Sequence, residues 1–128
     1  MMRRLLLALT AALMPAAALA ATGKVAIEFN DLQAADTGCR AVFVLNNGLE
    51  TPLDKLAFRV VAFDKDQKAK LFLTLDVGAL PVGKTRILRF DLGKDVGCDT
   101  IGRLVLDDVT ACAAKDLDAA ACLSATAL

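Results

Sequence analysis

The stretch Leu56-Ala-Phe-Arg-Val-Val-Ala-Phe63, followed by the polar run Asp64-Lys-Asp-Gln-Lys68, decides the fold class of this chain. The first segment is apolar on both alternating faces except at Arg59, which is typical of an interior β-strand covered on both sides. The polar run predicts a turn. Apolar residues then recur at every second position from Leu71 to Val77, which is the period of another strand. The centre of the chain therefore predicts a β-hairpin.

Segments with the same period lie on both sides of this hairpin. Two precede it, at 25–29 and 39–45, and two follow it, at 88–92 and 100–110. The last segment alternates imperfectly, which predicts a bulge or a sheet switch near Gly102. About six or seven short strands without a long helical period predict an all-β chain folded as an antiparallel β-sandwich, and we favour an immunoglobulin-like arrangement over a small barrel.

The N-terminus has the composition of a secretory signal peptide. Arg3 and Arg4 precede an apolar run that ends at Pro15 and is too short to span a bilayer. The small residues Ala18 and Ala20 predict cleavage after Ala20, and no cysteine follows to carry a lipid anchor. The arginine pair lacks the flanks of a twin-arginine motif, so we expect export to the periplasm by the Sec route. The predicted organisation is a signal peptide (1–20), a sandwich domain (21–112) and a C-terminal tail (113–128) with one short helix.

The charge of the exported chain gives no sign of a nucleic-acid or membrane partner. Loss of Arg3 and Arg4 leaves 15 − 2 = 13 basic residues against 15 acidic ones, a net charge of −2. Such a balance has neither the basic surface that binds nucleic acid nor the one that binds anionic lipid.

Four cysteines, at positions 39, 98, 112 and 122, predict two disulfides in an exported domain of this size. Cys98 and Cys112 bracket the last strand, which separates them far beyond the ~7 Å between Cα atoms that a bridge allows. If successive strands alternate in direction, Cys39 and Cys98 lie at one end of the sandwich and Cys112 at the other. This favours Cys39–Cys98 with Cys112–Cys122 over the pairing 39–112 with 98–122, provided that no strand is missed.

The residues that most enzymes and metal sites need are missing. The chain has no histidine, tyrosine or tryptophan, and its single serine is Ser124 in the tail. It contains no Cys-x-x-Cys spacing, so neither a redox site nor a zinc site is expected. A Ser-His-Asp site and an aromatic platform for bases or sugars are excluded. We therefore expect a protein that is not an enzyme and holds no cofactor or metal.

Carboxylates are the chemistry that remains, and we interpret them as solvated turns and strand ends. The adjacent pair Asp107 and Asp108 is expected to point to opposite faces of a strand, which prevents joint action. The turn at 64–68 lacks the ligands and the glycine of a calcium loop. The carboxylates considered are Asp64, Asp66, Asp107, Asp108, Asp116 and Asp118.

One further pattern is an ordered series of residues that covers nearly all of the exported chain. Its members are Cys39-Arg40, Asn46, Leu56, Phe58, Phe63-Asp64, Leu80-Pro81, Gly83-Lys-Thr85, Phe90, Cys98-Asp99, Ile101, Asp108-Val109, Cys112 and Cys122. In the order of its members, rather than in any one motif, the series resembles a group of small periplasmic proteins of Gram-negative bacteria, commonly labelled Tat pathway signal sequence domain proteins. The resemblance implies a periplasmic location and supplies no catalytic or binding residue.

Two functions from different classes fit this sequence. The first is a non-catalytic periplasmic interaction or structural module that binds an unknown protein partner through loops or sheet edges, and the second is a disulfide-stabilised inhibitor of a periplasmic hydrolase. The first loops to consider are Asn46 to Lys55 and Gly78 to Lys84. The six phenylalanines all fall in predicted strands, so we expect them to fill the core.

Overall fold

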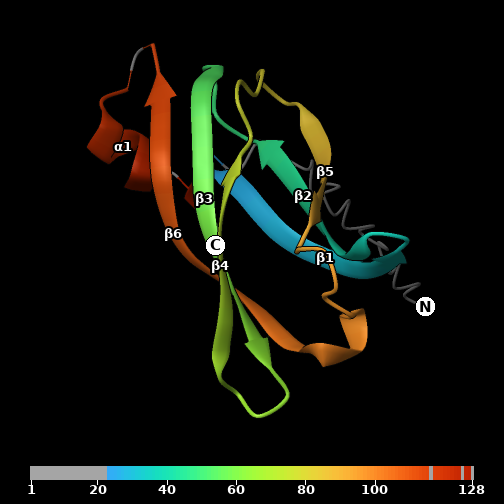
Figure 1. The fold of residues 1–128 in the computed structure, drawn as a ribbon. Helices are drawn as coiled ribbons and strands as arrows, with labels where there is room; N and C mark the ends of the chain where they lie inside the picture. Colours follow the sequence, from blue (N-terminus) through green and yellow to red (C-terminus); the bar gives the residue numbers. More distant parts are fainter. Residues whose placement is uncertain (1–22, 116, 125, 128) are drawn as a thin grey trace, which may run out of the picture.

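The chain folds into two packed β-sheets, as the computed structural model of residues 23–115, 117–124 and 126–127 describes it (Figure 1). One sheet has the order β4-β3-β6, and the other has the order β5-β2-β1 with the short β7 beside β1. The predicted antiparallel sandwich is confirmed. The predicted signal peptide and its cleavage site lie outside the described residues. The elements are β1 (Val25–Ala35), β2 (Gly38–Asn47), β3 (Leu53–Asp64), β4 (Ala69–Asp76), β5 (Thr85–Asp91), the 3-10 turn η1 (Cys98–Thr100), β6 (Ile101–Ala114), α1 (Ala119–Ser124) and β7 (Thr126–Ala127).

The central hairpin forms as the sequence predicts. β3 is the middle strand of its sheet, antiparallel to both β4 and β6. The Asp64 carboxylate closes the turn, because its Oδ1 accepts the N–H groups of Asp66 and Lys68 at 2.9 and 3.0 Å. Gln67 takes the positive φ of 63° that the turn needs.

The core lies between the two sheets and is built from alternate residues of each strand. Phe43 of β2 and Phe58 of β3 meet at its centre, with ring centroids 5.4 Å apart in an edge-to-face arrangement. Val25 and Ile27 share the inner face of β1, as their spacing predicts. These large side chains bury most of the apolar area that offsets the entropy of ordering the chain.

Irregular pairing is concentrated in β6. Three residues of β6 have no partner in the register with β3: Gly102, where a bulge was predicted, and Asp107 and Thr110, where none was. At Gly102 an added Cβ would lie 2.4 Å from the Asp64 carbonyl oxygen, so only glycine fits there. Between the first two bulges the register is regular from Arg103 to Leu106.

The two disulfides pair as strand direction predicts. Cys39 at the start of β2 is joined to Cys98 just before β6, with Cα atoms 4.9 Å apart. We call this the strand bridge. Cys112 near the end of β6 is joined to Cys122 in α1, with Cα atoms 5.7 Å apart. This tail bridge holds α1 against β6, and β7 then pairs parallel with the start of β1.

Candidate interaction surface

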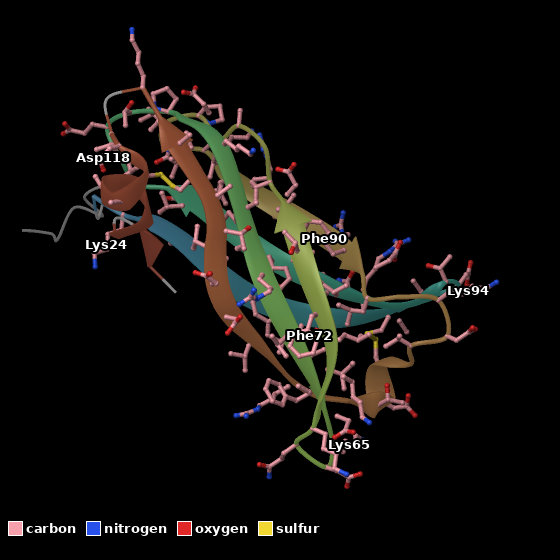
Figure 2. The ribbon with its side chains drawn as sticks, turned by 60° about the vertical axis from the view of Figure 1, so that its left-hand side comes forward. Lys24, Lys65, Phe72, Phe90, Lys94 and Asp118 are labelled. Carbon is pink, nitrogen blue, oxygen red and sulfur yellow. A yellow bond between two sulfur atoms is a disulfide. The ribbon has the colours of Figure 1, made fainter. Side chains whose placement is uncertain are left out.

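An apolar row crosses the outer face of the β4-β3-β6 sheet, on the side away from the core. Val61 of β3 pairs with Phe72 of β4 and with Val105 of β6 in register, so the three side chains lie abreast on one face. Phe72 is 67% exposed and Val105 36%, whereas Val61 between them is buried. Figure 2 looks onto this sheet and labels Phe72. We call these three residues the outer row.

β3 is buried on both sides, as predicted, but its outer side is not buried by a second layer of the described residues. Val61 and Ala57 on the outer side of β3 are 6% and 7% exposed. No second layer of the described residues covers this side, and the neighbouring strands supply the cover. An interior strand of a three-stranded sheet therefore has the same sequence pattern as one packed between two layers.

Cationic groups flank the outer row on both sides along the strands. On one side the guanidinium of Arg103 lies over the Phe63 ring, 4.5 Å from its centroid. On the other, Nε of Arg59 donates to Oδ2 of Asp107 at 2.6 Å. The row is thus an apolar strip between a positive group and an ion pair.

The bulge at Asp107 changes the expected geometry of the adjacent carboxylates. Asp108 is the register partner of Arg59, and Asp107 is the extra residue that bonds the same guanidinium. The prediction that these carboxylates face opposite sides of the strand is therefore wrong, because a bulge sets two residues against one on the neighbouring strand. Both carboxylates belong to the outer side of the sheet.

The outer face of the other sheet is more polar. Its large exposed apolar side chain is Ile87, which is 58% exposed and pairs with Val44. Arg40 and Asp91 form an ion pair at 2.9 Å across β2 and β5, and Arg89 is exposed nearby. The apolar pair of Ile87 and Val44 spans two strands, whereas the outer row spans all three strands of its sheet.

The six phenylalanines divide between the core and the surface, so the core prediction holds only in part. Phe43 and Phe58 are buried, and Phe90 is half-buried on the inner face of β5. Phe72 is on the outer face, and so is Phe63, whose ring lies under the guanidinium of Arg103. The sixth, Phe29, is 42% exposed although it packs on Phe43.

The two loops predicted to be exposed are tied to each other. The buried Asn47 side chain donates from Nδ2 to the carbonyl oxygens of Thr51 and Leu80 at 3.1 and 2.9 Å. Its Oδ1 accepts the N–H of Leu49 at 3.0 Å. The first loop is therefore packed around Asn47 and Leu49, whereas the second is buried at Leu80 and exposed at Ala79 and over 81–84, with Val82 at 51%. Sequence reasoning missed Asn47, because an Asn-Gly pair reads as an exposed turn.

Among the remaining candidate carboxylates, Asp66 is exposed in the β3–β4 turn, as predicted, and two others have local structural roles. Asp64 closes the β3–β4 turn, and Oδ1 of Asp118 accepts the N–H of Ala121 at 2.7 Å at the start of α1. Asp116 lies outside the described residues. Asp36, Asp91, Asp95 and Asp99 line an open hollow of about 890 Å³ beside the strand bridge, together with Lys94 and backbone.

All four cysteines are in disulfides, so no thiol is available among them. Within the described residues, no group of three or more potential metal-ligating side chains comes together. In the same part of the chain, no helix is both long enough and apolar enough to cross a membrane.

Comparisons of the chain with protein-family models, with curated proteins and with solved structures find no match. The outer row is the feature that sequence reasoning did not find. The signal was present at Phe72, which interrupts the polar side of the alternation from Leu71 to Val77.

Proposed function

We propose that this protein is a non-catalytic interaction module of the periplasm that binds a protein partner through the outer row. The observation that carries the proposal is the exposed Phe72 ring, 67% accessible at the edge of a continuous apolar strip. Large aromatic side chains of this kind supply most of the binding energy at protein interfaces. A contiguous apolar patch that includes such a ring is a feature of interaction sites, whereas single exposed apolar residues are ordinary.

Three observations support the periplasm as the location. Disulfides persist in oxidising compartments, and this chain has two, which fits an exported protein. The first residues have the composition of a cleavable signal, with Arg3 and Arg4 before a short apolar run. The resemblance to small periplasmic proteins points to the same compartment.

We also infer that the sandwich is immunoglobulin-like. In an immunoglobulin sandwich, strand A pairs with B, B with E, and C with F. The pairs β1–β2, β2–β5 and β3–β6 correspond to these in chain order, and β4 takes the place of strand C′. Strand G, which pairs with F in that fold, has no counterpart beside β6 among the described residues. Sheet faces and edges are the surfaces that such sandwiches use to bind partners.

A small inhibitor of a periplasmic hydrolase is the alternative, and the packed loops favour it. The Asn47 hydrogen bonds tie the two loops together at Thr51 and Leu80, and Val82 is 51% exposed next to this anchor. A rigid loop with an exposed apolar residue suits insertion into an active-site cleft, because little entropy is lost on binding.

Affinity capture from periplasmic extract, read by mass spectrometry, separates the two functions. We expect Phe72→Ser to lower recovery of the partner about tenfold or more, as removal of an interface hot spot does. The matched control is Ile87→Ser, a residue with similar exposure on the other sheet, and it should leave recovery unchanged. A hydrolase captured in a one-to-one ratio, and lost with Val82→Ser rather than Phe72→Ser, would support the inhibitor and refute the outer row.

A further inference from the structure

The outer edge of β6 is free over most of its length. β6 is the last strand of its sheet, and among the described residues only β3 pairs with it as a strand. Near its C-terminal end, α1 packs against β6 through the tail bridge. From Ile101 to Val109 the edge therefore offers unpaired backbone groups, which are a template for another strand. An immunoglobulin sandwich has strand G at this edge.

The middle of this edge is regular and amphipathic. Arg103 to Leu106 pair with β3 without a shift, between the bulges at Gly102 and Asp107. Leu104 and Leu106 face the core side and are partly exposed, while Val105 is 36% exposed on the outer face. A strand added here gains hydrogen bonds over a short segment and covers apolar surface on both faces.

We propose that the β6 edge binds the β6 edge of a second copy of this chain, antiparallel, about a two-fold axis at Val105. In this register Leu104 lies opposite Leu106 of the other copy. Arg103 lies opposite the bulge, where Asp107 is bonded to Arg59 and the neighbouring Asp108 is the carboxylate left to pair with it. The two three-stranded sheets become one continuous sheet. The two outer rows then form a single apolar strip, because the Val105 side chains lie opposite each other.

Charge complementarity identifies a second copy as the occupant. A symmetric antiparallel edge must carry opposite charges at equal distances on either side of its axis. Arg103 lies on one side of Val105, with Asp107 and Asp108 on the other. Neither Arg103 nor Asp108 forms an ion pair within the described residues. The bulge sets both carboxylates on the outer side, where Arg103 of the other copy arrives.

This self-association does not depend on the proposed partner of the outer row. Phe72 is on the far strand of the sheet, away from the β6 edge. Loss of partner capture with Phe72→Ser therefore tests the proposed function, and the oligomeric state tests the edge.

The test is sedimentation equilibrium of the chain purified after export, with disulfides intact, at concentrations up to about 1 mM. The wild-type chain should show a monomer–dimer equilibrium. Arg103→Glu and Asp108→Arg each place like charges in both symmetric contacts, so each should raise the dissociation constant about tenfold or more. Arg89→Glu makes the same charge change on the other sheet and should have no effect.

Mixing the two variants gives the sharpest result. A heterodimer of Arg103→Glu with Asp108→Arg has complementary charges in both contacts, so dimers should reappear when the two weakened variants are mixed. The double variant in one chain should also dimerise. A wild-type chain that is monomeric at all concentrations, or a mixture that stays monomeric while the wild type dimerises, would overturn the proposal. Far-UV circular dichroism of each variant checks that it is folded.

Discussion

Replacing Asn47 by alanine should destabilise the domain more than any other change to a polar side chain at the loop end of the sandwich. Asn47 is 0% exposed, and its amide makes three hydrogen bonds to the backbone. These bonds join the loop after β2 to the loop before β5. The amide group is required because it donates twice and accepts once, which no other side chain of this size can do.

The expected loss of folding free energy is the sum of the losses at the three backbone groups that bond to the Asn47 amide. The buried N–H of Leu49 loses the Asn47 oxygen, which costs about 1–3 kcal/mol. The Leu80 carbonyl keeps the N–H of Leu53 as a donor, so its loss is that of one ordinary bond, about 0.5–1.5 kcal/mol. The Thr51 carbonyl is only partly buried and loses a similar amount. The sum is about 4 kcal/mol, a large part of the stability of a domain this size.

Urea unfolding with intact disulfides measures this difference. We expect Asn47→Ala to lower the midpoint by about 2 M, with an unchanged slope of about 2 kcal/mol/M. Asn47→Asp should lower it further, because it buries an unpaired negative charge facing the Thr51 and Leu80 carbonyl oxygens. The control is Asn46→Ala, since Asn46 makes one exposed hydrogen bond to Thr85, and its loss should cost less than about 1 kcal/mol. Equal midpoints for the two alanine variants would refute the role given to the buried amide.

The same unfolding assay tests the core and the two bridges. Phe58→Ala removes a fully buried ring and should cost about 3–5 kcal/mol, whereas Phe72→Ala on the exposed surface should cost less than about 1 kcal/mol. Similar losses from both variants would place the core on the wrong side of the sheet. Replacing both cysteines of the strand bridge by serine should cost about 4 kcal/mol, and the same change in the tail bridge about 3 kcal/mol, because the first bridge closes a longer loop. Peptide mapping without reduction should show each bridge intact in the variant that lacks the other, and any crossed pair would contradict the strand directions.

The strands and the core face were predictable because alternation records which side of a strand is buried. Val25 and Ile27 on β1 illustrate this, since both face inward as their period of two requires. The disulfide pairing was predictable for a related reason. Strand direction alone brings Cys39 and Cys98 to the same end of the sandwich.

The outer row was not predictable, because an apolar position in a strand indicates that its side chain is buried but not which part of the protein buries it. Val61 is as buried as a residue between two layers, although its cover is the side chains of the adjacent strands. The bulge at Asp107 was also hidden. The alternation of β6 is imperfect at several positions, and its register with β3 decides which of them forms a bulge. The sequence of β6 alone does not specify that register.

Site-specific photocrosslinking in the periplasm tests the central claim, that the outer row is the binding surface. A photoreactive residue is placed in turn at position 72 on the outer row, at 87 on the other sheet and at 82 in the loop, where the native side chains are 67%, 58% and 51% exposed. We expect a protein adduct from position 72 and none from position 87. Adducts from position 82 or 87 with none from position 72 would contradict the account.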